Sequence, residues 1–287
     1  MDNKTCYIIN FYLGERRKAT FEYEQNRLYY LIKQINNLQT YSHSLNKIIF
    51  SFNMREEDYE YVSLIFDLVP KYIQGIKVEI YFRKNYGLSY GAWSDAFIKN
   101  EDQFDYFIFN EDDYFFVQDN WDTYLVNKFN LYEDCGYLCM VTKEPHYLND
   151  FKKHAGHSSG ISSNTVLKQV KNKFKILPHS KNSDYSSNEV QGQINQSFCM
   201  LELGYNIYDV RDDYRIPFAW TDPNDTLDII RFHWWNNDSL IIPAILLNNN
   251  QSNNWWQPEG EHNKIFTPST IVEALNHYQN KINYGGY

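Results

Sequence analysis

The sequence predicts an α/β protein whose central, mainly parallel sheet is flanked by helices. In the first half of the 287-residue chain, short apolar runs alternate with stretches whose apolar residues recur at helical spacing. Strand and helix alternate at a pitch that favours right-handed crossovers between parallel strands. An acidic cluster follows the last apolar run of this half. Ligands of such sheets gather at the carboxyl ends of the strands, so this cluster lies where a site is expected.

Four apolar runs in the first half predict strands, and the amphipathic stretches between them predict helices. Val78, Ile80 and Phe82 alternate with polar residues, as in a half-buried strand. Residues 28–35 carry apolar side chains at helical spacing, and Pro70 ends the next amphipathic stretch. The predicted strands cover residues 6–12, 47–52, 76–82 and 104–109, and the predicted helices cover residues 21–38, 59–69, 90–99 and 121–129.

The second half of the chain is less regular, and its elements are predicted from shorter signals. Gly204 suits a helix C-cap, because glycine adopts the left-handed conformation there without steric cost. The asparagine-rich residues 248–254 are expected to form an exposed loop. The remaining predicted elements are strands over residues 136–142 and 205–210, helices over residues 163–170, 189–203 and 272–282, and a polar loop over residues 144–160.

Charge and composition exclude several classes of protein. The formal net charge of -9 argues against a basic face that grips nucleic acid. The four cysteines form no Cys-x-x-Cys pair, which favours reduced thiols in a reducing compartment. The N-terminus lacks the pattern of a signal peptide, and the apolar residues 240–247 are too few to span a bilayer. We therefore expect a cytoplasmic protein with no nucleic-acid partner and no membrane span.

The first candidate for chemistry is the acidic triplet after the fourth predicted strand. Glu111, Asp112 and Asp113 are consecutive carboxylates that follow an apolar run. Carboxylate oxygens are hard ligands that suit Mg²⁺ or Mn²⁺, and Mg²⁺ is usually held by one or two carboxylates plus substrate phosphates. The alternative is a solvated acidic turn that begins the next helix.

The second candidate is the turn after the third predicted strand. Gly87 and Gly91 permit a tight turn and a close approach of the backbone to a ligand. Arg83 offers a cation, and the start of the following helix offers N–H donors for a diphosphate. The alternative is a glycine-containing turn before an ordinary helix.

The two candidates together resemble the GT-A-fold glycosyltransferases. In that family the turn and helix line the donor site, and an acidic triplet called the DxD motif binds the metal and the nucleotide sugar. Glu111, Asp112 and Asp113 match this triplet, with Glu in place of the first Asp. Residues 85–93 are similar to the corresponding segment of bacterial and viral polysaccharide-type transferases. The resemblance covers roughly residues 6–210 and is firm only over residues 76–116.

The resemblance also implies a fold and a domain organisation. We expect a GT-A-like, Rossmann-type mixed sheet, mainly parallel and flanked by helices. A catalytic domain over residues 1–245 would divide into a donor half, about 1–118, and an acceptor half, about 119–245. Residues 246–287 would form a C-terminal extension packed on the same domain.

Further residues are assigned by their positions relative to the family pattern. Under the resemblance Glu111 and Asp113 are metal ligands, and His233, in an aromatic setting, completes the metal shell. His154 and His157 are rivals of His233, and each of these histidines has a purely structural alternative. The ends of the first and second strands commonly face the nucleotide in the family. The donor-binding candidates are therefore Asn10, Asn53, Arg83, Asn85, Gly91 and Asp112.

Glu189 is the candidate general base. It opens a helix that ends in a Gly-Tyr-x-Ile pattern, which resembles the base-bearing segment of the family. A carboxylate within hydrogen-bond reach can take the proton of an acceptor hydroxyl, and direct displacement would then invert the anomeric centre. Asp184 is a reserve candidate. The alternative is a carboxylate that only stabilises the N-terminus of a helix.

These assignments predict a metal-dependent glycosyltransferase. Its donor would be a nucleoside diphosphate sugar, its acceptor a glycan or another hydroxyl compound, and its cofactor Mn²⁺ or Mg²⁺. A sugar nucleotidyltransferase is one alternative, although it requires a different phosphate-binding loop after the first strand. A non-catalytic carbohydrate-binding protein is the other, and the acidic triplet after a core strand counts against it.

Overall fold

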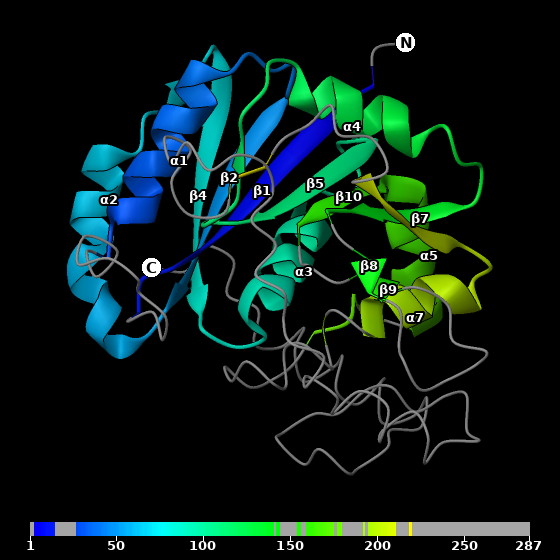
Figure 1. Ribbon diagram of the computed structural model, residues 1–287. Helices are drawn as coiled ribbons and strands as arrows, with labels where there is room; N and C mark the ends of the chain where they lie inside the picture. The colour runs from blue at the N-terminus through cyan, green and yellow to red at the C-terminus, as the bar shows by residue number, and fades with distance from the viewer. Residues whose placement is uncertain are drawn as a thin grey trace.

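The computed structural model of the chain has a single large sheet at its centre (Figure 1). The eight strands lie in the order β11-β7-β10-β5-β1-β2-β4-β3. Helices flank the sheet, so the predicted fold class, a Rossmann-type mixed and mainly parallel sheet, is confirmed. The structure describes residues 3–14, 27–140, 142–143, 154–155, 159–174, 177–179, 192, 195–210 and 218–219.

Most strand pairs of the large sheet are parallel, and the exceptions involve β3 and β10. Two further two-stranded sheets pair β6 with β12 and β8 with β9. The large sheet contains β1 (Thr5–Tyr12), β2 (Lys47–Met54), β3 (Tyr72–Ile73), β4 (Ile76–Lys84), β5 (Tyr106–Glu111), β7 (Cys135–Cys139), β10 (Gly160–Ser163) and β11 (Asn206–Asp209). The small sheets contain β6 (Phe115–Phe116), β8 (Thr142–Lys143), β9 (His154–Ala155) and β12 (Phe218–Ala219).

The helices lie on both sides of this sheet. Figure 1 shows α1 and α2 at one end of the molecule and α5 and α7 at the other. None of the helices in the described ranges is long and apolar enough to cross a membrane. Their bounds are α1 (Tyr29–Thr40), α2 (Val62–Leu68), α3 (Leu88–Asn100), α4 (Trp121–Phe129), α5 (Asn164–Phe174) and α7 (Asn195–Glu202), and a 3-10 helix, η2, covers Glu56–Tyr61.

The structure corrects three of the predicted elements. The helix expected over residues 59–69 is preceded by η2, at whose start the backbone N–H and the guanidinium of Arg55 donate to the carboxylate of Asp58. The strand expected over 136–142 ends at Cys139. The expected loop over residues 144–160 contains β9 and the start of β10, whose short, serine-rich sequence lacks an alternating pattern. The other predicted strands, and the predicted helices that lie in described ranges, are confirmed within a few residues or in their described part.

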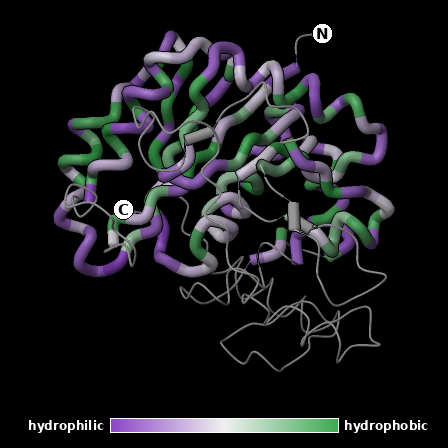
Figure 2. Tube along the Cα trace, in the orientation of Figure 1, coloured by the Kyte–Doolittle hydropathy of each residue, from purple (hydrophilic) through white to green (hydrophobic). Residues whose placement is uncertain are grey.

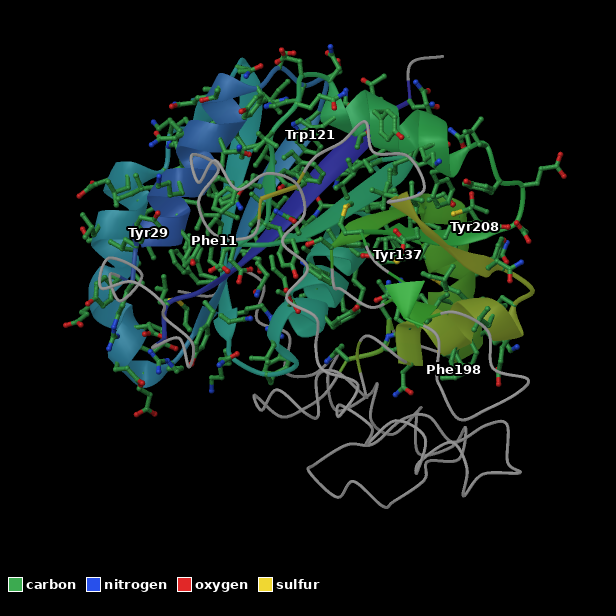
Figure 3. All side chains as sticks on the ribbon, viewed as in Figure 1. Phe11, Tyr29, Trp121, Tyr137, Phe198 and Tyr208 are labelled. Carbon is green, nitrogen blue, oxygen red and sulfur yellow. The ribbon has the colours of Figure 1, made fainter. Side chains whose placement is uncertain are left out.

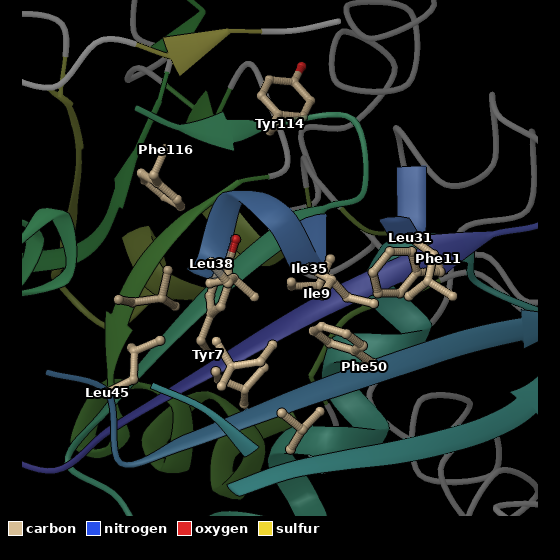
Figure 4. Close-up of a cluster of buried hydrophobic side chains, with 14 of the residues drawn as sticks. Tyr7, Ile9, Phe11, Leu31, Ile35, Leu38, Leu45, Phe50, Tyr114 and Phe116 are labelled. Carbon is tan, nitrogen blue, oxygen red and sulfur yellow. The ribbon is translucent and has the colours of Figure 1, made fainter. Parts of the chain in front are cut away.

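Alternate residues of the strands build two separate cores. Figure 4 shows the first core, in which side chains of β1 and β2 meet the apolar stripe of α1. Phe11 and Phe50 pack edge to face with ring centroids 5.1 Å apart, and Leu31 and Ile35 belong to the same cluster. Burying each such side chain contributes roughly 1.5–3 kcal/mol, so this layer stabilises the sheet strongly.

The second core lies on the face of the sheet that α3 covers. Cys6 and Ile8 of β1 pack there with Trp93 and Phe97 of α3. Figure 3 labels aromatic side chains at opposite ends of the described fold, with Tyr29 in α1 and Phe198 in α7. Figure 2 shows hydrophobic and hydrophilic segments interleaved along the described elements.

All four cysteines are free thiols, as the sequence predicts, and all four are buried. Burial raises the pKa of Cys6 well above its ordinary value, because desolvation disfavours the thiolate. Burial likewise raises the pKa of Cys135 and Cys199. These thiols act as small apolar side chains of the core.

The alternation of side chains decides which face the candidate residues occupy. Asn10 lies two residues beyond Ile8 in β1, and Glu111 lies two residues beyond Phe109 in β5, so both share the α3 face. The same count places Asn53 and Arg83 on that face. Because β1, β2, β4 and β5 run parallel, their carboxyl ends meet at one edge of the sheet. Polar side chains therefore replace the apolar core at this edge.

Candidate functional site at the carboxyl edge of the sheet

Three of the donor-binding candidates form one buried hydrogen-bonded network. Asn53 Nδ2 donates to Asn10 Oδ1 over 2.7 Å. Arg83 Nη1 donates to Asn53 Oδ1, and Arg83 Nε donates to Asp95 Oδ2 over 2.7 Å. The network joins β1, β2 and β4 to α3. We call these residues, Asn10, Asn53, Arg83 and Asp95, the amide–guanidinium network.

Arg83 and Asp95 form a buried ion pair within this network. Their side chains are 5% and 6% exposed. Burial raises the pKa of Asp95 above its ordinary value, and the charge of Arg83 opposes that rise. The guanidinium carbon of Arg83 also lies 4.3 Å from the ring centroid of Tyr86. The charge of Arg83, which lies at the carboxyl edge of the sheet, is therefore balanced inside the protein by Asp95.

Asp95 is the network residue that the sequence analysis missed. It lies in α3 between apolar and small residues, in the run Ala-Trp-Ser-Asp-Ala-Phe. A carboxylate on an otherwise buried helix needs a partner, because an isolated buried charge is very costly. An acidic residue in an otherwise apolar helix segment was therefore the signal in the sequence. Arg83, at the end of the preceding strand, was its available partner.

The turn between β4 and α3 is held close to the network. Asn85 N–H donates to the carbonyl of Met54 at the end of β2 over 3.1 Å. Gly87 has φ +65°, in the left-handed region, and precedes the first residue of α3. At Gly91 a Cβ would lie 2.4 Å from the carbonyl oxygen of Tyr86 and 2.8 Å from Arg83 Nη2. Glycine is thus required at 91 by the turn and by the guanidinium.

Several polar side-chain atoms beside the network are buried without a hydrogen-bond partner in the described part of the chain. They come from the middle of β2, the end of β4, the turn that follows β4 and α3. Buried polar atoms in folded proteins almost always have partners, so each of these atoms suits a polar ligand or an ordered water, as do similar atoms elsewhere in the described chain. The atoms are Ser51 Oγ, Arg83 Nη2, Asn85 Oδ1, Ser89 Oγ, Ser94 Oγ and Asp95 Oδ1.

The acidic triplet begins at the end of β5 and continues into a turn that buried amides support. Asn110 Nδ2 donates to the carbonyl of Tyr114 over 2.8 Å and to the hydroxyl of Tyr7 over 2.7 Å. Gln34 Nε2 donates to the carbonyls of Asp112 and Tyr114, over 2.8 and 2.6 Å. These bonds cross from α1 to the turn, so the first core supports the acidic triplet.

The three carboxylates of the triplet have different environments. Asp112 is buried, and its Oδ2 accepts a hydrogen bond of 3.1 Å from Tyr12 N–H at the end of β1. Glu111 and Asp113 are half-buried. Glu111 stands in register with Asn10 of β1, which brings the triplet beside the network. Asp112 therefore links the two strand ends, while its neighbours lie nearer the surface.

A metal ion at this turn would need ligands beyond those of the described residues. No group of three or more His, Cys, Asp or Glu side chains within them is arranged to hold a metal. Two half-buried carboxylates nevertheless suit Mg²⁺ or Mn²⁺ when substrate phosphates complete the shell. Glu189, His233, Asp184 and His157 lie outside the described residues, and so does the side chain of His154.

A second cation at the same edge was also missed by the sequence analysis. Arg55 directly follows β2, and its guanidinium lies 5.4 Å from the ring centroid of Tyr12. It pairs with Asp58 over 2.8 Å, and Arg27 pairs with the same carboxylate over 3.2 Å. Burial tends to raise the pKa of Asp58, but the hydrogen bonds from Arg55 hold it below its ordinary value. A basic residue directly after a strand was the signal for this position.

The chain has distant structural likenesses to known proteins. No protein-family model matches the chain, and no curated protein matches it. A cytidylyltransferase from Leptospira borgpetersenii serovar Hardjo-bovis (strain JB197) is similar in structure, with 11% identity over 98% of this chain and 97% of that chain, at a TM-score of 0.41. A CMP:2-keto-3-deoxy-manno-octonic acid synthetase complexed with CTP has 12% identity over 72% and 88%, also at 0.41. S. aureus TarS has 10% identity over 97% of this chain and 43% of that chain, at 0.40. Likenesses of this size assign neither a family nor an activity.

Proposed function

We propose that the chain is a metal-dependent glycosyltransferase of the GT-A kind, which moves a sugar from a nucleoside diphosphate sugar to a hydroxyl acceptor. One observation supports this most directly. The acidic turn and the amide–guanidinium network share one edge of the sheet, where Glu111 is in register with Asn10. A nucleotide-sugar donor needs hydrogen-bond partners for the nucleoside and a metal for the diphosphate side by side.

The metal would be held by Glu111 and Asp113, with His233 as a third ligand. When bound, Mn²⁺ or Mg²⁺ supplies positive charge that stabilises the diphosphate leaving group. Asp112 would hold the end of β1 against the acidic turn through its bond with Tyr12 N–H. The turn of Asn85 and the start of α3 would then face the donor, beside polar atoms that suit a polar ligand.

The acceptor side rests on residues assigned by the resemblance. Glu189 would accept the proton of the attacking hydroxyl, which gives direct displacement and inversion. The donor half would cover residues about 1–118 and the acceptor half about 119–245, with residues 246–287 packed on the same domain.

A donor screen tests the proposal. The full chain is incubated with nucleoside diphosphate sugars and Mn²⁺, and release of the nucleoside diphosphate is measured with and without a chelator. We expect metal-dependent hydrolysis of at least one donor, and metal-dependent binding of its nucleoside diphosphate. A parallel assay offers nucleoside triphosphates with sugar phosphates. Release of pyrophosphate in that assay, with no donor hydrolysis, would replace the transferase with a nucleotidyltransferase.

A further inference from the structure

The chemistry of the side chains fixes which atoms donate and which accept along the amide–guanidinium network. A guanidinium nitrogen carries hydrogens and cannot accept, so the Asn53 atom that meets Arg83 must be the amide oxygen. The other end of Asn53 is then its NH₂ group, which donates to Asn10 over 2.7 Å. The Asn10 atom that receives this bond must be an oxygen. The remaining polar atom of Asn10 is therefore its own NH₂ group, a donor.

This remaining donor lies at the carboxyl edge of the sheet. Asn10 is on the α3 face of β1, opposite Glu111 of β5, and 6% of it is exposed. Its Nδ2 has no hydrogen-bond partner among the residues that the structure describes. The amide of Asn10 cannot turn over without placing two NH₂ groups against each other. Asp95 holds Arg83, Arg83 holds Asn53, and Asn53 holds Asn10.

We propose that Asn10 is a specificity-determining residue that presents this N–H donor to a carbonyl oxygen on the base of the bound nucleotide. The proposal rests on the proposed function. It assigns the site to a base with a carbonyl at the position that Asn10 faces, such as uracil or guanine. An amino group there, as in cytosine or adenine, would place two donors in contact.

The fixed polarity of Asn10 is the reason for choosing the base over the ribose. A hydroxyl both donates and accepts, so it adapts to either end of an amide. A carbonyl accepts only, and an exocyclic amino group donates, so they distinguish the two ends. Leaving buried donors unpaired reduces affinity by roughly ten- to a hundredfold. Asp95, Arg83 and Asn53 together fix the orientation of the Asn10 amide. That orientation affects binding when the ligand atom is a carbonyl oxygen or an amino group.

The test uses the full chain with Mn²⁺ and measures the dissociation constants of UDP, CDP, GDP and ADP by calorimetry. For the wild type we expect UDP over CDP, or GDP over ADP, by about tenfold or more. Asn53→Asp keeps an oxygen toward Arg83 and places a second oxygen toward Asn10, which must turn its NH₂ inward. Asn10→Asp reverses the outward polarity without changing Asn53. In both variants the keto-over-amino ratio should fall to one or below.

The ratio separates base reading from charge, because an added carboxylate weakens all four nucleotides together. Asn36→Asp, at an exposed position of α1, is the matched control and should leave the ratio unchanged. If Asn53→Asp does not fold, as thermal unfolding would reveal, Asn10→Asp and Asn10→Ala decide the matter. An unchanged ratio in the folded Asn10 variants overturns the inference and leaves the transferase proposal standing. Equal affinity of the wild type for all four nucleotides also overturns the inference about Asn10 and leaves the transferase proposal standing. Failure to bind any nucleotide contradicts both the inference and the transferase proposal.

Discussion

Arg83 Nε donates to Asp95 Oδ2 over 2.7 Å, at the point where β4 passes into α3. Both side chains are almost fully buried, so each charge depends on the other. The pair also lies next to Asn53, which connects it to β2 and β1. The same ion pair therefore stabilises the fold and, through Asn53, orients the side chains of the candidate site.

Removing the cation of this pair should destabilise the fold strongly. In Arg83→Ala the carboxylate of Asp95 stays buried without its partner, which costs about 3–5 kcal/mol of unfolding free energy. Urea unfolding measures the loss. Lys168→Ala is the control, because Lys168 pairs with Asp102 over 2.8 Å at the surface, where solvent screens the charges and little loss is expected. Similar losses in the two variants would mean that the buried pair is not a structural requirement.

Asp113→Ala should remove metal-dependent nucleotide binding with little effect on folding. Asp113 is half-buried in the acidic turn, so its loss opens no core cavity. Calorimetry with UDP or GDP and Mn²⁺ should show affinity lower by roughly tenfold or more, since even indirect supports of a metal ligand carry effects of that size. Asp102→Ala, at an exposed ion pair, provides the comparison. Unchanged metal-dependent affinity in Asp113→Ala would count decisively against this site.

Gly91→Ala should destabilise the protein although alanine is the better helix former. Alanine in place of a mid-helix glycine usually stabilises by about 0.5–1 kcal/mol. Here the added Cβ would lie 2.4 Å from the carbonyl oxygen of Tyr86, and overpacking of this kind costs typically 1–3 kcal/mol. Thermal unfolding should give a lower midpoint, and nucleotide affinity should fall because the turn shifts. A higher midpoint with unchanged affinity would disprove the tight contact.

Glu79 should make folding sensitive to acid. Burial tends to raise its pKa, but hydrogen bonds from Lys47, Lys77 and Tyr81 lower it from 4.5 to about 2. A depressed folded-state pKa stabilises the protein above pH 4.5, and this contribution is lost as the pH falls toward 2. The unfolding free energy of Glu79→Gln should therefore depend less on pH over that window than the wild type does. The exposed Glu133→Gln is the control, and parallel curves for wild type and Glu79→Gln would refute the assignment.

Glu189→Gln tests the proposed base. The amide keeps the shape of the side chain but cannot take a proton, so the variant should bind donor and metal normally and transfer roughly 10²–10⁴-fold more slowly. NMR of the product should show the anomeric configuration opposite to that of the donor. Asp184→Asn serves as the comparison, and a loss confined to that variant would move the role to Asp184. A retained configuration would remove the general base from the mechanism.

The amino-acid sequence was sufficient to predict the four parallel strands β1, β2, β4 and β5 and the edge at which polar residues gather, but not the two-residue strands β3 and β6. Apolar runs and their alternation are local properties of the chain, and parallel strands bring their carboxyl ends together. It did not predict β10, because Gly160–Ser163 has no pattern of its own and pairs with β5 and β7 across long sequence separations. Asp95 was missed for a related reason, since an acid in a helix is buried or exposed according to what packs against it.

The residue types at the strand ends were determined by the sequence alone: Asn10, Asn53, Arg83 and the carboxylates that begin at Glu111. The tertiary structure decided how these residues act on one another. It matched the charge of Arg83 to Asp95, turned Asp112 toward the end of β1, and oriented the amide of Asn10 through Asn53. The physical reason is that periodicity is written along the backbone, whereas the direction of a hydrogen bond and the balance of a buried charge depend on neighbours that only the packed sheet and α3 bring within 3 Å or so.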